Sequence, residues 1–286
     1  MDTRFWLIQA FNGISYGALL FLVGSGLSLI FGVMRIVNLA HGSYFLLGGY
    51  VALTVIWTTG SWLLALPVAA LAIALVGLFM ERVFLRPLGF DPLRQVLLTV
   101  GFSFLFQQAA LDIWTGNNFD INPPEALTRS IVVGGLYLPL YRVFMIATAL
   151  AIGAMLWLVM EKTRMGAAVR ATVDDAQMAR GVGIDTSRIS MLIFSLGAFL
   201  AALGGVIGGA FLGIYPGLDF EMLPLAFAVV IIGGMGSLGG AAIGALLVGL
   251  ADNFGKALFP EISYFTLYAP MALILAVRPT GLFGRE

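Results

Sequence analysis

The sequence predicts an all-α protein, a polytopic bundle of transmembrane helices. Hydrophobic residues make up 60% of the 286 residues and charged residues only 10%, whereas an ordinary soluble domain has about 25% charged residues. The mean hydropathy is +1.00. A helix needs about 20 apolar residues to cross the hydrocarbon core, so the chain has room for about eight or nine crossings. We therefore expect residues 1–286 to form one transmembrane domain surrounded by lipid, with no separate soluble domain.

Apolar segments bounded by charged residues, glycine or proline predict the individual helices. In chain order these segments are Trp6–Phe31, Leu39–Trp57, Trp62–Phe84, Gln95–Trp114, Val143–Met160, Ile189–Leu212, Met222–Ile232, Ala241–Leu258 and Ser263–Val277. The first segment is far longer than the apolar part of a signal peptide and lacks a small-residue cleavage site, so we expect it to be the first crossing. In this segment Gly13 and Gly17 have the spacing at which two membrane helices pack closely.

The distribution of lysine and arginine predicts the orientation, because cytoplasmic loops of membrane proteins are enriched in both residues. If the polar segment 161–188 is cytoplasmic, all basic residues lie inside except Arg4, Arg129, Arg142 and Lys256. The N-terminus is then external and the C-terminus cytoplasmic. The loop 115–140 is external as well, and its composition predicts an ordered cap with a short hairpin. This loop either docks another protein or only joins two helix ends.

Residues 161–188 form the one long, charge-rich segment of the chain. Thr172 is followed three residues later by Asp175, which fits the capping box [S/T]-x-x-[D/E]. We therefore expect Thr172 to cap a short helix over Val173–Arg180, with Asp174 and Asp175 at the positive end of the helix dipole. A helix this short does not fold alone, so it either sits in a groove of another protein or belongs to a solvated connector.

The same segment contains signals for where its helices end. Arg180 falls in the last turn of the expected helix, where a cation is favoured. Gly181, followed by Gly183, is expected to take the left-handed conformation that ends a helix. Upstream, the preceding apolar helix is expected either to continue through Gly166 and Arg170 or to break just after its own end, at Gly166.

Four phrases together resemble a known family. They are GLSLIFGVMRIVNLAHG at Gly26–Gly42, DPLRQVLLT at Asp91–Thr99, GGMGSLGG at Gly233–Gly240 and RPTGLFG at Arg278–Gly284. As a set they resemble the LivH-type permeases of branched-chain amino-acid importers, which belong to the ABC importers, and the resemblance covers essentially the whole chain. The segment 161–188 is similar to the loop through which such permeases couple to their ATPases.

The resemblance implies an ABC-importer permease fold in a bacterial inner membrane, moving branched-chain or related amino acids, small amides or carboxylates inward. A second homologous permease, two ABC ATPase subunits and an extracytoplasmic solute-binding protein are implied as separate chains. ATP and Mg²⁺ then bind to the ATPases, and no cofactor is expected here, in keeping with the lack of a G-x-x-x-x-G-K-[S/T] phosphate loop. The implied coupling residues are Gly166, Arg170, Thr172, Asp174, Asp175, Arg180, Gly181 and Gly183.

Breaks in the apolar segments point to a solute path, because irregular backbone at membrane depth is tolerated only where it faces a cavity or protein. The break at Arg35–Gly42 contains Asn38 and the only histidine of the chain, His41, three residues apart. Asn38, His41 and Gly42 either belong to an inner gate and solute path, or His41 acts as a cap or interface hydrogen-bonding group. A second break lies at Gly233–Gly240.

Neutral polar residues form a stripe on one predicted helix. Thr99, Ser103 and Gln107 follow one another in steps of four residues, so they share one face. This stripe either lines an uncharged conduit or joins helices through hydrogen bonds.

Several other functions are disfavoured. The absence of cysteine excludes disulfides, thiolate metal sites and thiol catalysis, and no metal site is expected. The chain lacks H-E-x-x-H and G-x-S-x-G motifs, which argues against an intramembrane enzyme, and its zero net charge indicates no nucleic-acid binding. We expect almost no titratable residue deep in the helices, although a proton-driven carrier needs such groups. An autonomous carrier or channel for a small neutral solute is the alternative to ATP-driven import.

Overall fold

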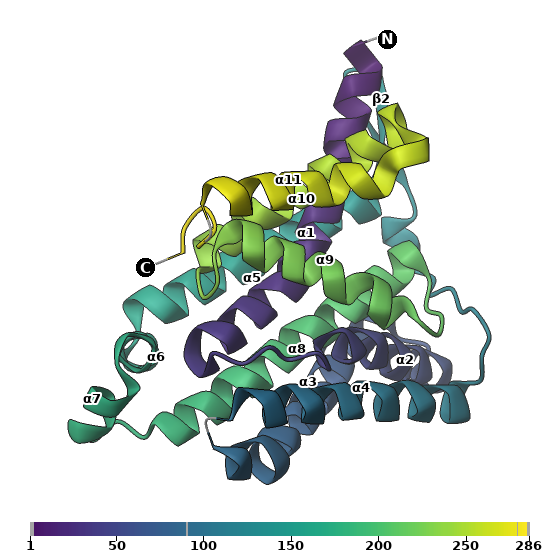
Figure 1. The fold of residues 1–286 in the computed structure, drawn as a ribbon. Helices are drawn as coiled ribbons and strands as arrows, with labels where there is room; N and C mark the ends of the chain where they lie inside the picture. Colours follow the sequence, from purple (N-terminus) through teal and green to yellow (C-terminus); the bar gives the residue numbers. More distant parts are fainter. Residues whose placement is uncertain (1–2, 90, 279, 285–286) are drawn as a thin grey trace.

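The computed structural model describes residues 3–89, 91–278 and 280–284, and Figure 1 shows that they form one helical bundle. All of the predicted apolar helices are formed, and each predicted range falls within a few residues of the observed one. They are α1 (Thr3–Met34), α2 (His41–Thr59), α3 (Trp62–Met80), α4 (Pro92–Trp114), α5 (Leu140–Lys162), α8 (Thr186–Leu212), α9 (Leu218–Gly233), α10 (Leu238–Leu258) and α11 (Ser263–Val277). The polytopic, mostly helical fold is therefore confirmed.

Within the described residues, six helices are long and apolar enough to cross a membrane. They are α1, α4, α5, α8, α10, and α3 together with its extension through the π-helical turn η1 (Glu81–Leu85) and the 3₁₀ turn η2 (Arg86–Leu88). The helices α9 and α11 have only 16 and 15 residues, and α2 does not meet the same criteria. Beyond these six helices, the number of crossings stays a prediction.

Close contacts between glycines and neighbouring helices hold α1 against its neighbours. The helix packs against α5, α8, α9 and α10. A Cβ at Gly17 would lie 2.8 Å from the carbonyl oxygen of Ala245 in α10, and one at Gly13 would lie 3.0 Å from the Cα of Leu250. The predicted close packing through Gly13 and Gly17 is therefore confirmed.

One end of the bundle carries the N-terminus and a small sheet. Strand β1 (Ser130–Val133) pairs antiparallel with β2 (Leu136–Pro139) through a turn at Gly134 and Gly135, so the predicted hairpin in the loop 115–140 is confirmed. The 3₁₀ turn η3 (Glu125–Leu127) precedes it, and η4 (Pro260–Ile262) joins α10 to α11. The Arg4 guanidinium lies beside Gly135, which brings the N-terminal helix to this sheet (Figure 1).

The opposite end carries the short helices α6 (Arg164–Asp174) and α7 (Ala176–Gly181). The end of the described chain also lies on this side (Figure 1). There Leu282 and Phe283 donate backbone hydrogen bonds to the last carbonyls of α9, those of Ile232 and Gly233 (2.9 and 3.0 Å). Segments 161–188, 234–237 and 281–284 therefore gather at one end, as alternation of the predicted helices requires.

Candidate functional site

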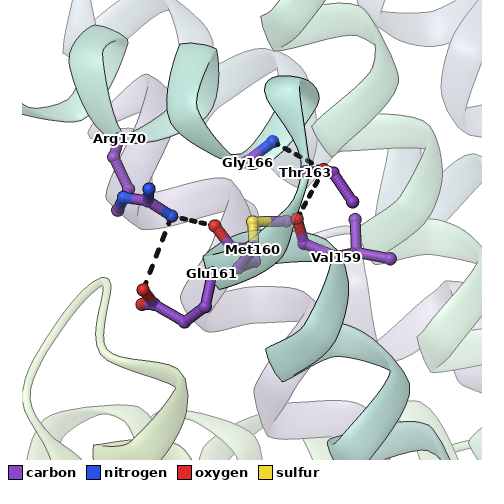
Figure 2. A network of polar contacts seen from close by, with 6 residues as sticks. All are labelled: Val159, Met160, Glu161, Thr163, Gly166 and Arg170. Atoms are coloured by element: carbon purple, nitrogen blue, oxygen red, sulfur yellow. Dashed lines mark hydrogen bonds and ion pairs between the residues drawn. The ribbon is translucent and has the colours of Figure 1, made fainter.

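The junction between α5 and α6 is a sharp corner held by hydrogen bonds (Figure 2). Thr163 ends α5 in an extended conformation and caps α6, because its hydroxyl accepts a hydrogen bond from the Gly166 amide (3.1 Å). The same hydroxyl donates to the carbonyl of Val159 (2.6 Å). The chain therefore breaks at Thr163, three residues before the break expected at Gly166.

Gly166 allows the corner to be tight. A Cβ at this position would overlap the carbonyl oxygens of Val159 and Met160, so α6 crosses directly over the last turn of α5. Only glycine lacks the atom that would prevent this approach. The sequence predicted Gly166 as a possible helix break. It did not predict that Gly166 contacts the last turn of α5.

Arg170 closes the corner from the other side. Its guanidinium donates to the carbonyl of Met160, and it lies 3.8 Å from a carboxylate oxygen of Glu161 (Figure 2). Both charged side chains are about half exposed, and an exposed ion pair contributes little stability. The bond to the carbonyl matters more, because the last carbonyls of a helix have no partner within the helix. Thr163, Gly166 and Arg170 thus connect α6 rigidly to α5.

The N-terminus of α7 is capped by Asp175, not by Thr172. One Asp175 oxygen accepts hydrogen bonds from the amides of Gln177 and Met178 (2.8 and 2.9 Å). Thr172 lies inside α6 and donates to the carbonyl of Ala168 (2.8 Å). The predicted capping box was wrong, because a cap residue is non-helical and α6 already runs through Thr172. Asp174 is the last residue of α6.

The C-terminus of α7 is closed by Gly183, not by Gly181. Gly183 has φ +90°, whereas Gly181 is the last helical residue and has no positive φ. Gly183 donates to the carbonyl of Arg180 and Ile184 to that of Ala179 (both 3.0 Å), which is the Schellman pattern of helix ends. A glycine does close α7, as predicted, but it is Gly183 and not Gly181. Arg180 does lie in the last turn, as predicted.

The tip of α7 exposes apolar side chains in an otherwise polar segment. Met178 and Val182 are 66% and 71% exposed, while Ala179 is buried against the rest of the protein. Exposed apolar groups rimmed by charges are typical of a surface that contacts another protein. The corner and the α7 tip together form the first part of the candidate site, which we call the coupling segment (residues 159–184).

The second part lies where α2 begins, deep inside the bundle. His41, the first residue of α2, donates from Nε2 to the carbonyl of Val23 in α1 (3.0 Å), and a Cβ at Gly26 would lie 3.2 Å from its ring. Val23 and Gly26 lie two or more helical turns before the end of α1 at Met34. The segment between α1 and α2 therefore turns back into the bundle, which confirms the predicted break in regular backbone.

The predicted path residues of this break are fully buried. Asn38 accepts a hydrogen bond from the Ala40 amide (3.1 Å), and neither Asn38 Nδ2 nor His41 Nδ1 has a hydrogen bond of normal geometry among the described residues. Thr99 of α4 accepts a bond from the Leu39 amide (3.2 Å). The break and the polar stripe of α4, which were predicted separately, therefore meet. The bond from His41 to Val23 fits an interface role, and contact with solute stays a prediction.

The stripe on α4 faces inward for most of its length. Thr99 and Ser103 are buried and donate to the carbonyls of Val96 and Val100 in their own helix (2.9 and 2.7 Å), whereas Gln107 is half-buried. Gln95 extends the stripe by one turn and donates to the carbonyl of Gly89 (2.5 Å). Sequence spacing was sufficient to find Gln95, because it lies four residues before Thr99.

The start of α9 meets the start of α2, a contact that the sequence did not predict. A Cβ at Gly42 would lie 2.5 Å from the backbone oxygen of Asp219, and Ser43 donates to an Asp219 carboxylate oxygen (3.1 Å). Asp219 is 2% exposed. Its carboxylate lies in the first turn of α9 and next to the first turn of α2, and a negative charge is favoured at both positions.

The expectation that deep segments carry almost no titratable residue was therefore wrong. Asp219 lies outside the predicted helix because the apolar run begins only at Met222, whereas α9 begins at Leu218. Glu81 is also buried, at 2% exposure, in the π-helical turn that follows α3. Both carboxylates lie at the edge of an apolar run in the sequence, but inside the protein in the fold.

Comparison with known proteins agrees with this architecture. The family described as "Branched-chain amino acid transport system / permease component" matches residues 9–275. The chain is 33% identical to the high-affinity branched-chain amino acid transport system permease protein LivH of Escherichia coli (strain K12), over 98% of this chain and 96% of the relative. It is 29% identical to the corresponding protein BraD of Pseudomonas aeruginosa over the same shares.

A more distant relative is the autoinducer 2 import system permease protein LsrC of Escherichia coli, 31% identical over 66% of this chain and 56% of the relative. All of these relatives are transport permeases, and the match to LivH extends over nearly the entire helical bundle. The chain is a multi-pass protein of the inner membrane and belongs to the family of permease components of branched-chain amino acid transport systems.

Proposed function

We propose that this chain is the membrane-spanning permease subunit of an ATP-driven importer for branched-chain or closely related amino acids. ATP and Mg²⁺ bind to two separate ATPase chains that contact the coupling segment from the cytoplasm. A second homologous permease and an extracytoplasmic solute-binding protein complete the complex. In this arrangement the N-terminus is external and the C-terminus cytoplasmic. Family membership supports the transport function, and the α5–α6 corner supports the ATP coupling.

The corner supports coupling because it links an exposed surface to a long helix. A force on the α7 tip reaches α6, and α6 cannot move independently of α5 while Gly166 and Arg170 hold the last turn of α5. Shifting a two-state equilibrium from one extreme to the other takes about 5.5 kcal/mol of differential binding. A docked ATPase that closes on ATP can supply such a difference, whereas a few neutral hydrogen bonds along α4 cannot.

Reconstitution tests the proposal directly. The chain is placed in proteoliposomes with and without its second permease, ATPases and binding protein, and uptake of labelled leucine is followed. We expect uptake that requires ATP and every partner, and no flux through this chain alone. Leucine flux through the isolated chain without ATP would support the alternative, an autonomous carrier or channel.

Removing the cap of α7 is expected to weaken the ATPase contact. Asp175→Ala removes the acceptor for two amides at the start of α7, which costs about 1 kcal/mol of helix stability. We expect several-fold less ATPase to co-purify with the permease and a matching loss of uptake. Asp175→Asn keeps a capping oxygen and is the control. Equal behaviour of the two variants would show that the cap does not support docking.

The closing glycine of α7 offers a second test. Gly183→Val places a β-branched side chain at φ +90°, a conformation that costs an ordinary residue about 1–2 kcal/mol. We expect reduced ATPase co-purification and reduced leucine uptake. Gly181→Ala is the matched control, because a Cβ there meets no atom within 4 Å and the backbone has no positive φ. Loss of function in Gly181→Ala but not in Gly183→Val would contradict the observed cap.

A further inference from the structure

The surface at the start of α9 carries an acidic side chain at an unusual depth. Glu221 lies in the first turn of α9 and is exposed, next to Phe220. The Phe220 ring lies 6.1 Å from the ring of Phe104, which is near the middle of the 23-residue helix α4. Glu221 is therefore placed near the middle of the bundle's length and not at either end.

Lipid is an unfavourable neighbour for this carboxylate. Ionised groups at membrane depth are costly in hydrocarbon, and they face the interior of a bundle or a water-filled cavity. The described part of the chain leaves Glu221 exposed. Apart from the Tyr215 hydroxyl, the described residues leave this carboxylate to be solvated by water, a solute or another subunit.

The carboxylate is held in a defined position. The Tyr215 hydroxyl donates to Glu221 Oε2 (2.9 Å). Tyr215 lies in a turn in which Gly213 and Gly217 have φ +79° and +97°, a region that favours glycine. The Leu218 amide donates to the Tyr215 carbonyl (3.2 Å), so the turn folds back over the start of α9. Tyr215 is thus a positioning residue for Glu221.

A second carboxylate, that of Asp219, is buried two residues before Glu221. Asp219 is 2% exposed, and Ser43 binds one of its carboxylate oxygens. The other oxygen, Oδ1, has no hydrogen bond of normal geometry among the described residues. Two carboxylates within one helical turn create a negative potential, which favours a positively charged ligand.

The residue before Glu221, Phe220, pairs with Phe104 and supplies exposed apolar surface at this depth. Phe104 is 57% exposed and Phe220 is 44% exposed. Small-molecule sites combine mostly apolar walls with a few placed polar groups, and an ammonium group is also attracted to the face of an aromatic ring. A carboxylate held by Tyr215, on the residue that follows this aromatic pair, therefore complements a small molecule with an ammonium group and an aliphatic side chain.

We propose that Glu221, Phe220 and Phe104 form a contact site for the transported amino acid, which we call the α9 acidic patch. Glu221 pairs with the ammonium group of the amino acid, and the two rings pack against its aliphatic side chain. The patch lines the path between this permease and its partner permease. This inference rests on the proposed import of amino acids and assigns a substrate contact within it.

Thiol labelling tests whether water and substrate reach the patch. The chain contains no cysteine, so Glu221→Cys introduces its only thiol. The matched control is Leu150→Cys, which is 69% exposed near the middle of α5. In the assembled importer, we expect a charged, membrane-impermeant methanethiosulfonate to modify Glu221→Cys at least tenfold faster than Leu150→Cys. We also expect leucine-loaded binding protein with ATP to slow this modification severalfold.

Two results of this labelling would overturn the proposal. Modification in the isolated permease but not in the assembled importer would assign the patch to the contact with the second permease. Modification that leucine and ATP do not slow would remove the substrate contact. If Glu221→Cys does not reach the membrane, Phe220→Cys places the thiol in the same patch and is read in the same way.

Uptake separates this proposal from the proposed function. We expect Glu221→Gln to lower leucine uptake at least tenfold at saturating loaded binding protein, Glu221→Asp to keep most of it, and Tyr215→Phe to lose a few-fold. ATPase co-purification should be equal in all variants. If the unaltered importer takes up no leucine, the proposed function fails. If it takes up leucine and Glu221→Gln does so equally fast, only the α9 acidic patch is refuted.

Discussion

Gly166→Ala is expected to abolish leucine uptake while leaving the permease in the membrane. The added methyl group would overlap the carbonyl oxygens of Val159 and Met160, and neither backbone group can rotate away without breaking the last turn of α5. Overpacking of this kind costs about 1–3 kcal/mol or more. The strain is relieved most easily by opening the α5–α6 corner, so Arg170 loses its bond to Met160. Uptake should fall at least tenfold.

Three measurements distinguish loss of coupling from loss of folding. Membrane abundance and the amount of co-purified ATPase report assembly, and ATP hydrolysis stimulated by loaded binding protein reports the docked state. We expect near-normal abundance with hydrolysis that no longer drives uptake. Gly181→Ala, which adds a methyl group in open space on the same segment, should take up leucine normally. Normal uptake by Gly166→Ala would mean that the corner does not transmit motion.

Gly42→Ala is expected to have the second-largest effect. Its methyl group would lie 2.5 Å from the backbone oxygen of Asp219 and 3.0 Å from Cβ of Leu223, so the first turns of α2 and α9 must separate. Separation removes the hydrogen bond from Ser43 to Asp219 and leaves a buried carboxylate without a side-chain partner. We expect a loss of about 2 kcal/mol of stability, a lower thermal-unfolding midpoint in detergent and at least tenfold slower uptake.

Gly101→Ala is the matched control for this variant. Gly101 also lies in a membrane helix, α4, but a Cβ there meets nothing within 4 Å. Alanine is the better helix former by about 1 kcal/mol, so this variant should be as stable as the unaltered protein or more stable. If Gly42→Ala unfolds at the same temperature as Gly101→Ala, the contact between α2 and α9 does not stabilise the bundle.

Most of the fold was predictable because a single physical quantity, apolar length, determines where membrane helices form. The end of α4 at Trp114, the start of α3 at Trp62 and the end of α8 at Leu212 agree with the predicted boundaries. The hairpin was predictable too, because Gly134 and Gly135 supply the positive φ that its turn requires.

The local sequence did not determine the corner and the caps of the coupling segment. Thr163 and Thr172 are both threonines ahead of short helical stretches, and Thr172 has the better local signal because Asp175 follows it. The choice between them depends on Gly166 and Arg170 folding back onto the last turn of α5, which is a contact between helices and not a property of the loop. Asp175 caps α7 because it is the extended residue between the end of α6 and the start of α7.

The burial of Asp219 and Glu81 could not be predicted from the sequence for a related reason. Hydropathy assigns a charged residue at the edge of an apolar run to the membrane surface, and the predicted helix Met222–Ile232 accordingly left out Asp219. That assignment fails where a helix starts inside the bundle, and both α2 and α9 do so. Asn38, His41 and Asp219 lie close to these helix starts. The first backbone amides of α2 and α9 lack partners within their helices, and polar side chains at the same depth can supply them.

The bonds that Leu282 and Phe283 make to the end of α9 also affect how the protein is made. The carbonyls of Ile232 and Gly233 emerge from the ribosome long before the residues that satisfy them. Until translation has passed Phe283, this end of α9 cannot take its final form, whatever the earlier helices have done. The final form of this end of α9 therefore depends on synthesis through Phe283, and a product terminated before Leu282 should remain open here and be recognised by membrane proteases.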